Sequence, residues 1–342
     1  MTVEHVTFPA GGAESGITDC AADLYLPEGA SRTERRPGII LFWSGTVSKE
    51  ANTGAAWYLA RAGYACLAMD FRTSGASAGT PRGQLYPDNF VQDVRCALFY
   101  LSSRPEVDPE RIGLHGVSLG GGVALQVAAF DRRVRCVSVL YPSALMGWAQ
   151  LPQDMIQNDI AQRVATGRGA TRQFVGVDTW TEPARGYARQ ATELYPTFDN
   201  TILVESFEKM TLWNPARFAD KISPTPVQFL GVSGDDAYHD LTQMRQVMED
   251  SVREPKRMVV LPYDSMGLYI EPGLGEGMRA TIEWFDHHLL GRPLTRRFDA
   301  GGRPAGEPRD PATTPLAPDA QAAGLCPGFA NWQPSWDPAT ER

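Results

Sequence analysis

The 342-residue sequence has few of the residues that build disulfides and metal sites. It contains 5 cysteines and 5 histidines, and the cysteines lie far apart in the chain. Isolated cysteines within or beside predicted elements are typical of reduced packing residues rather than of disulfides or metal ligands. We therefore expect no disulfide, no metal ion and no cofactor.

Long apolar runs and excess positive charge are also missing. No stretch of about 18 apolar residues could span a bilayer, and the first nine residues lack the basic and apolar parts of a signal peptide. The 32 Lys and Arg residues against 40 Asp and Glu residues leave a net charge of -8. This charge disfavours nucleic acid and anionic membranes as partners. The sequence predicts a soluble cytoplasmic protein whose partner is a small molecule.

A serine stands in a G-x-S-x-G frame made by Gly116, Ser118 and Gly120. The frame follows an apolar run at 112–114 and precedes a helical stretch at 122–130. This order is the pattern of a nucleophile elbow, a strained strand-to-helix turn that lifts the serine hydroxyl above a sheet. The two glycines avoid collisions between a Cβ and the neighbouring backbone. We expect the Leu119 N–H, at the helix start, to act as an oxyanion-hole donor.

Strands and helices alternate around the elbow. Buried apolar runs predict strands, and amphipathic spacing predicts helices. The predicted strands are 37–43, 65–70, 112–114, 134–141, 227–232 and 257–262, and the predicted helices are 57–62, 88–101, 122–130 and 280–290.

The segment from Asp70 to Gly79 reads D-F-R-T-S-G-A-S-A-G. It resembles the D-x-R-G-x-G-x-S-x-G strand and loop of the serine-aminopeptidase and dienelactone-hydrolase-like branch of the α/β-hydrolase superfamily, with Thr73 where a glycine is usual. The resemblance is close over about residues 20–142 and looser over about 215–291. It implies an α/β-hydrolase fold with a mostly parallel central sheet flanked by helices. In that fold the loop after the strand 37–43 supplies a second oxyanion donor, here Gly45 or Thr46.

The chain divides into three parts by composition and by this resemblance. Residues 1–143 and 223–291 are expected to form the α/β-hydrolase core, and residues 144–222 a helical cap over the serine. The aromatic residues of the cap either line an apolar cavity or hold the cap on the core; they are Trp148, Phe174, Trp180, Tyr187, Tyr195, Phe198, Phe207 and Trp213.

Residues 292–342 are rich in proline, glycine and alanine, with few apolar side chains among them. A disordered tail would seldom carry two tryptophans and a phenylalanine. We therefore expect an extended arm that docks on its own domain, or on a second subunit in a homodimer, through Leu325, Phe329, Trp332 and Trp336. A disordered tail is the alternative.

The catalytic acid is expected directly after the strand 227–232, where the chain reads Ser-Gly-Asp-Asp. The family spacing favours Asp235, and a glycine-first loop pattern favours Asp236. The alternative is a solvated acidic turn.

The family's histidine is missing from its usual loop after the strand 257–262. Met266 stands in its place, and a thioether cannot take the proton of Ser118. Loss of the histidine from a serine hydrolase costs on the order of a million-fold in turnover. The sequence therefore predicts a degenerate Ser-(Met)-Asp triad, with a substrate pocket lined by Met266, Tyr263, Tyr269 and Trp43.

Among the five histidines, only His239, four residues after Asp235, is expected on the rim of the site. It is the candidate replacement base, although this would require acid and base to exchange neighbourhoods. The alternative is an exposed loop histidine. The others are expected at the terminus, beneath the elbow and on the last helix; they are His5, His115, His287 and His288.

Three functions fit these residues. We favour a lyase that eliminates a carboxylate such as acetate from an O-acyl, polyketide-type intermediate, with Asp235 or Asp236 as base. Some α/β-hydrolase-fold enzymes of tetronate polyketide pathways eliminate acetate in this way, which is an analogy of fold. One alternative is a serine esterase, thioesterase or lactonase with a non-standard base such as His239. The other is a non-catalytic small-molecule binding protein.

Overall fold

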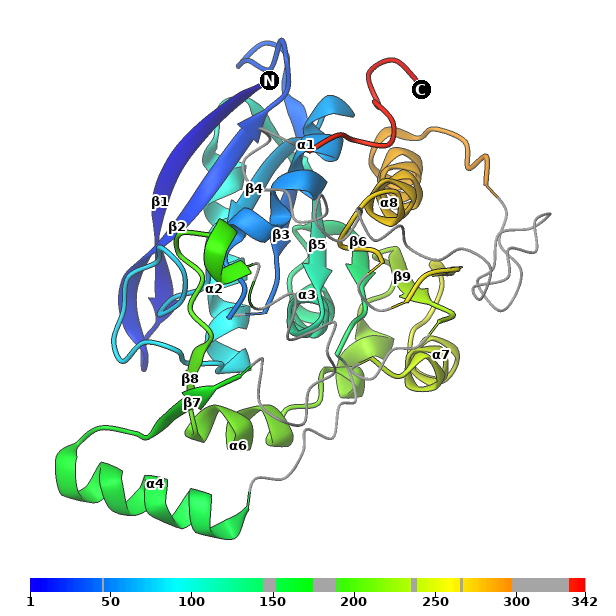
Figure 1. Cartoon of the computed structure of the whole chain (residues 1–342). Helices are drawn as coiled ribbons and strands as arrows, with labels where there is room; N and C mark the ends of the chain where they lie inside the picture. Colours follow the sequence, from blue (N-terminus) through cyan, green and yellow to red (C-terminus); the bar gives the residue numbers. More distant parts are fainter. Residues whose placement is uncertain are drawn as a thin grey trace.

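The computed structural model describes residues 1–44, 46–143, 152–174, 189, 191–234, 239–264, 267–296 and 332–341. An eight-stranded sheet of order β1-β2-β4-β3-β5-β6-β9-β10 runs through the molecule (Figure 1). The hairpin of β1 (Thr2–Gly12) and β2 (Gly16–Leu26) joins antiparallel to β4, and the other six strands are parallel to one another. Those six are β3 (Arg36–Phe42), β4 (Ala65–Met69), β5 (Val107–Val117), β6 (Val134–Leu140), β9 (Val227–Val232) and β10 (Lys256–Leu261).

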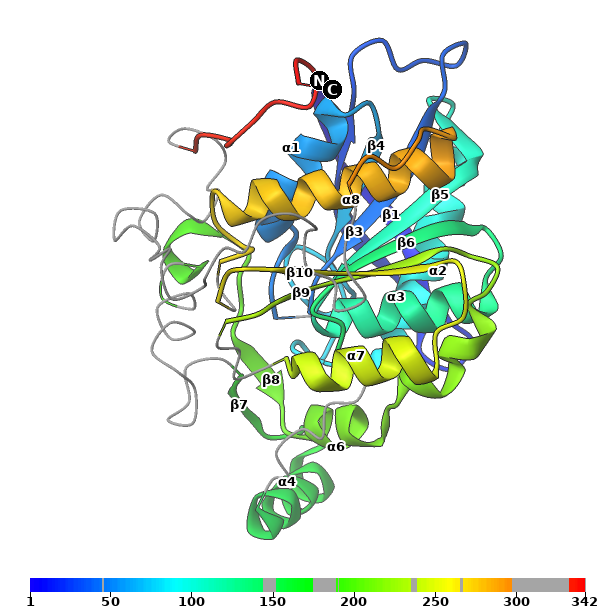
Figure 2. The same ribbon diagram turned by 90° about the vertical axis from the view of Figure 1, so that its right-hand side faces the viewer.

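Helices cover both faces of the sheet, which is why the parallel strands read as continuous apolar runs. One face carries α1 (Thr53–Arg61) and α8 (Gly273–Leu290), and Figure 2 shows α8 above β9 and β10. The other face carries α2, α3 and α7. Their bounds are Pro87–Ser103, Leu119–Phe130 and Leu241–Asp250. This is the expected α/β-hydrolase architecture. Within the described residues, no helix is long and apolar enough to cross a membrane.

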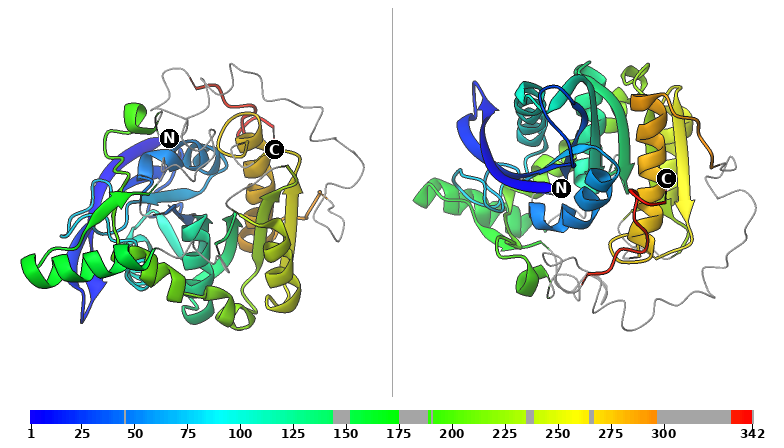
Figure 3. Two further views of the ribbon diagram at one scale, coloured as in Figure 1. Left: turned by 60° about the horizontal axis from the view of Figure 1, so that its bottom comes forward. Right: turned by 90° about the horizontal axis from the view of Figure 1, so that it is seen from above.

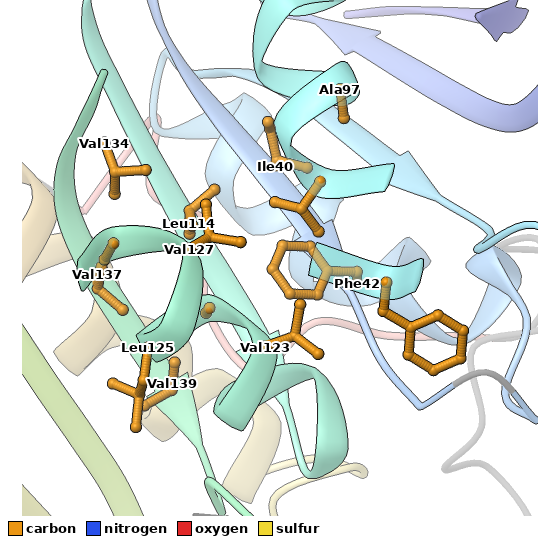
Figure 4. Close-up of a cluster of buried hydrophobic side chains, with 14 of the residues drawn as sticks. Ile40, Phe42, Ala97, Leu114, Val123, Leu125, Val127, Val134, Val137 and Val139 are labelled. Atoms are coloured by element: carbon orange, nitrogen blue, oxygen red, sulfur yellow. The ribbon is translucent and has the colours of Figure 1, made fainter. Parts of the chain in front are cut away.

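The largest apolar cluster lies between the sheet and the α2–α3 face (Figure 4). Ile40 of β3, Leu114 of β5 and Val139 of β6 are fully buried there. They pack with Val123 of α3 and Ala97 of α2 in the same cluster. Because these strands are buried on both faces, the turn at the end of β5 has a rigid base.

The segment between β6 and β9 differs from the purely helical cap that the sequence predicted. It holds α4 (Gln153–Thr166), α6 (Glu205–Leu212) and the 3-10 helix η2 (Pro215–Lys221), but also a two-stranded antiparallel sheet. The strands are β7 (Thr171–Gln173) and β8 (Thr201–Leu203). Local periodicity misses such a pair because its two halves are short and distant in sequence. The Leu203 N–H donates to the Gly83 carbonyl at 2.9 Å, which ties this segment to the core.

The end of the chain packs against the face formed by α1 and α8 (Figure 3). The ring of Trp332 lies 5.3 Å from that of Trp57, and the ring of Trp336 lies 5.4 Å from that of Tyr58. Trp336 Nε1 also donates to the Gly275 carbonyl at 2.9 Å. Both tryptophans are therefore buried on the chain's own domain, whereas Leu325 and Phe329 lie outside the described residues.

Candidate active site

Ser118 occupies the turn between β5 and α3. Its φ of 54° and ψ of -120° lie in a region that a residue with a Cβ rarely adopts. A Cβ at Gly116 would lie 2.4 Å from the Gly120 carbonyl oxygen, and one at Gly120 would lie 2.5 Å from the Trp43 carbonyl oxygen. Both glycines are thus required by close backbone approach, as the G-x-S-x-G frame predicts.

The surrounding backbone holds the strained turn in place. The Ser118 N–H donates to the Leu140 carbonyl at 2.9 Å, and the Ser118 carbonyl accepts from the N–H groups of Gly121 at 2.9 Å and Ser143 at 3.0 Å. The side chain is half-buried. Its Oγ lies 3.4 Å from Ser143 Oγ and 3.0 Å from His239 Nε2.

An imidazole therefore contacts the elbow serine, and it comes from the loop after β9. His239 directly precedes α7, whose N-cap Asp240 accepts the Thr242 N–H at 2.7 Å. The imidazole stacks on Tyr141, with ring centroids 4.8 Å apart and planes 19° apart. Tyr141 itself has a positive φ of 49° at the end of β6. A helix cap and a ring stack together orient the imidazole toward Ser118.

Several residues that the sequence singled out lie outside the described residues: Gly45, Asp235, Asp236 and Met266. Their roles stay predictions. The two loops that carry the acid and histidine positions are joined, because the Gly234 N–H donates to the Tyr263 carbonyl at 3.0 Å. Asp264, the next residue, accepts the Gly267 N–H at 2.8 Å. Asp264 was not among the residues that the sequence analysis selected, although its place after β10 was visible.

Two of the three residues expected to donate to the oxyanion, Leu119 and Thr46, lie within the described residues. Leu119 is the first residue of α3, where helix N–H groups have no intrahelical partner. Thr46 is buried, with its Oγ1 3.3 Å from Ser44 Oγ. The neighbouring Val47 N–H already donates to the Ser44 carbonyl at 3.0 Å. The roles of Leu119 and Thr46 as oxyanion-hole donors stay predictions.

Asp70 fastens the loop that follows β3. Its Oδ1 accepts the Lys49 N–H at 2.6 Å, and its Oδ2 accepts the Ala76 N–H at 2.8 Å. The residue is 2% exposed, and burial raises the pKa of its carboxyl group to about 7. The aspartate of the D-x-R motif therefore fixes the start of η1 (Lys49–Asn52) and the loop at Ala76 through the hydrogen bonds that it accepts.

A pocket lies beside the elbow, between the sheet and the two helices α1 and α8. Trp43, Tyr269 and Tyr195 line it, as does Val117, which precedes Ser118. The rings of Trp43 and Tyr269 are 4.6 Å apart. Tyr263 is buried but is not part of this lining, unlike the expectation from the sequence. The difference arises because the Tyr263 side chain packs in one apolar cluster with Val232 of β9 and Leu261 of β10, and lies against Gly267.

Across the described ranges, no group of three His, Cys, Asp or Glu residues could hold a metal ion. Cys20, Cys66 and Cys136 are buried, and burial raises the pKa of each thiol, so none of them is a nucleophile at neutral pH.

A family model described as "Alpha/beta hydrolase family" matches residues 40–266. The chain belongs to the alpha/beta hydrolase family. It is similar to polyketide transferase ATR5 of Stachybotrys chlorohalonatus, with 30% identity over 241 residues that span 66% of this chain and 80% of the relative. It is also similar to thiohydrolase aneE of Aspergillus aculeatus, with 29% identity over 219 residues that span 57% of this chain and 67% of the relative.

The solved structure of the alpha/beta hydrolase GrgF from Penicillium sp. sh18 has the same fold. Its TM-score is 0.72 at 21% identity, and the match covers 85% of this chain and 100% of that chain. Family membership together with the strained elbow identifies this alpha/beta hydrolase as an enzyme.

Proposed function

We propose that this alpha/beta hydrolase transfers acyl groups through a covalent intermediate on Ser118, with His239 as the general base. The distance of 3.0 Å between Ser118 Oγ and His239 Nε2 carries the proposal. As Oγ attacks the carbonyl carbon of an ester or thioester, the imidazole takes the hydroxyl proton. The same proton then goes to the departing alcohol or thiol. Water or a second alcohol, deprotonated by His239, finally attacks the acyl-serine and releases Ser118.

The oxyanion of each tetrahedral intermediate needs donors next to Ser118. The Leu119 N–H at the start of α3 supplies one, helped by the positive end of the helix dipole. An N–H of the loop after β3, at Gly45 or Thr46, supplies the second. The Asp70 carboxyl group accepts the Lys49 N–H and so helps to hold the segment after β3 in place.

The substrate that we propose is a polyketide-type acyl group carried as an ester or thioester. Relatives named polyketide transferase and thiohydrolase support this class. The aromatic and aliphatic lining of the pocket beside Ser118 suits such a chain.

The elimination hypothesis depended on a serine without an imidazole. Since His239 contacts Ser118, the premise no longer holds, and acyl transfer explains the contact directly. Elimination of a carboxylate with Asp235 or Asp236 as base stays a prediction, and so does a non-catalytic binding role.

A trapped acyl group gives the direct test. Mixing the protein with p-nitrophenyl acetate should add one acetyl group to Ser118, detected by mass spectrometry of the digested protein. Ser143→Ala is the matched control, because Ser143 Oγ is only 3.4 Å from Ser118 Oγ. The adduct should persist in Ser143→Ala and vanish in Ser118→Ala. Turnover by Ser118→Ala, or an adduct confined to Ser143, would contradict the proposal.

The acid that supports His239 can be identified by three isosteric changes: Asp235→Asn, Asp236→Asn and Asp264→Asn. Loss of the triad aspartate in a characterised protease lowers kcat by about ten-thousand-fold, because the imidazole is held in the wrong tautomer. We expect a loss of this size for Asp235→Asn and losses below about tenfold for the other two. A large loss for Asp264→Asn alone would place the acid on the loop after β10.

A further inference from the structure

We propose that the pocket between α1 and α8 binds the distal part of the acyl group, an apolar chain that carries an oxygen accepting a hydrogen bond from Asn52 Nδ2. This inference rests on the acyl transfer proposed at Ser118 and adds the class of chain that the site selects.

The pocket exists because small residues face each other across the two helices. Gly54 and Ala55 of α1 line one wall, and Gly277 of α8 lines the other. A Cβ added at Gly277 would first meet Leu230 at 3.9 Å and Leu268 at 4.0 Å, which are ordinary contacts. Backbone packing therefore does not demand a glycine at this position, and its effect is to leave room.

Most of the lining is apolar, and Asn52, His115 and Thr281 add buried polar side chains to it. Asn52 is 2% exposed and His115 is 3% exposed. Asn52 Nδ2 and His115 Nδ1 have no hydrogen-bond partner in the described part of the chain. Burial lowers the pKa of His115 to about 4, so its ring is neutral at pH 7. A buried donor without an acceptor is costly, and an oxygen on a bound chain would satisfy it.

The pocket extends from the end of β5 to α8. Val117 and Leu140, which line it, directly precede Ser118 and Tyr141, and Gly277 and Met278 of α8 line it as well. A chain attached to Ser118 would enter the pocket past Val117.

Filling the pocket at Gly277 is the first test. Gly277→Leu should lower kcat/KM for p-nitrophenyl decanoate by about tenfold or more while that for p-nitrophenyl acetate changes less than about twofold. Gly277→Ala adds only one methyl group at ordinary contact distance, so it should lower kcat/KM for the decanoate by less than Gly277→Leu does. Equal effects on the two esters, or no effect of Gly277→Leu on either in a protein of unchanged Tm, would overturn the proposal.

Binding without turnover separates this inference from the proposed function. Calorimetry should detect binding of decanoic acid to the Ser118→Ala protein. Adding Gly277→Leu should raise the Kd of decanoic acid by about tenfold. If the wild type shows no acyl adduct but this difference in binding is seen, the acyl-transfer proposal fails and the pocket stands. If the adduct forms and the binding is unaffected, the pocket assignment fails.

The role of Asn52 is tested with a chain that carries a ketone. Wild-type protein should prefer p-nitrophenyl esters of oxodecanoic acids, with the ketone near the far end, over the plain decanoate. Asn52→Leu keeps the size of the side chain and removes the donor, so this preference should fall by about fivefold or more. A preference that is absent in the wild type, or unchanged in Asn52→Leu, would contradict the assigned hydrogen bond.

Discussion

The His239→Ala variant is expected to lose on the order of a million-fold in kcat with an ester substrate, the scale seen when the histidine of a characterised serine hydrolase is removed. Without the imidazole, nothing at 3.0 Å accepts the Ser118 proton as the bond to the carbonyl carbon forms. The residual rate, about a thousand-fold above that in water, reflects binding and the oxyanion donors alone. Steady-state kinetics with p-nitrophenyl acetate measures the loss.

A control and a double variant make this result specific. His287→Ala changes a histidine in the last turn of α8, whose ring contacts the Arg292 carbonyl, and should leave kcat unchanged. The double variant Ser118→Ala with His239→Ala should lose no more than either single variant, because the two side chains act as one unit. Additive losses, or a loss below about tenfold for His239→Ala, would show that the 3.0 Å contact is not catalytic.

Asp70→Asn is expected to remove part of the pH dependence of the free energy of unfolding. Burial raises the pKa of Asp70 from 3.8 to about 7 in the folded protein. Between these values the folded state binds a proton that the unfolded state does not, so the wild type gains stability as the pH falls through 7. From pH 8 to pH 5 the gain is roughly 2 to 3 kcal/mol, and an asparagine cannot show it.

Urea unfolding of both proteins at pH 5 and pH 8 measures this difference, and taking it between the two proteins cancels the other titrating groups. The free energy of unfolding of the wild type minus that of Asp70→Asn should be larger at pH 5. In the variant, the asparagine NH2 group replaces the carboxyl oxygen that accepted one backbone N–H, so that N–H loses its acceptor. This loss lowers the free energy of unfolding of the variant by about 1 to 3 kcal/mol at both pH values. A difference that stays constant with pH would refute the raised pKa.

The sequence predicted the core of the fold well because its signals are local. The strand at 227–232 coincides with β9, and the predicted strands 37–43 and 134–141 differ from β3 and β6 by a single residue at either end. The start of α8 was missed by seven residues, since glycines at 273, 275 and 277 weaken the helical pattern. Packing of α8 against the sheet and α1 outweighs the low helix propensity of these glycines. A local sequence pattern carries no information about such packing.

The site was only partly predictable, and the reason is geometric. The G-x-S-x-G frame contains its own turn, so Ser118 was found from five residues. The contact of His239 with Ser118 depends on the path of the loop after β9 and on the cap of α7. The sequence instead drew attention to Met266, which stands where the family has its histidine. The Asp-Leu-Thr-Gln step that begins at Asp240 is a helix-start signal, and it would have placed His239 directly before a helix.

The sequence predicted two lining residues of the pocket beside the elbow, Trp43 and Tyr269, but not the part of the pocket between α1 and α8, because that part depends on residues from opposite ends of the chain. Gly54 lies in α1 and Gly277 in α8, and only the sheet on which both helices pack brings them together. A glycine in a predicted helix reads as a weak helix former. That such a glycine leaves space between two helices becomes clear only when the residue facing it on the other helix is known.

The family model matches residues 40–266, whereas α8, which carries Gly277, begins at Gly273. Ser118 and the α8 wall of the neighbouring pocket therefore lie in separate parts of the sequence. Exchanging the stretch after residue 266 between relatives would trade one wall for another and leave the elbow untouched. If Gly277 shapes the acyl pocket as proposed, similarity over residues 40–266 reports the fold and the elbow but not the α8 wall of that pocket.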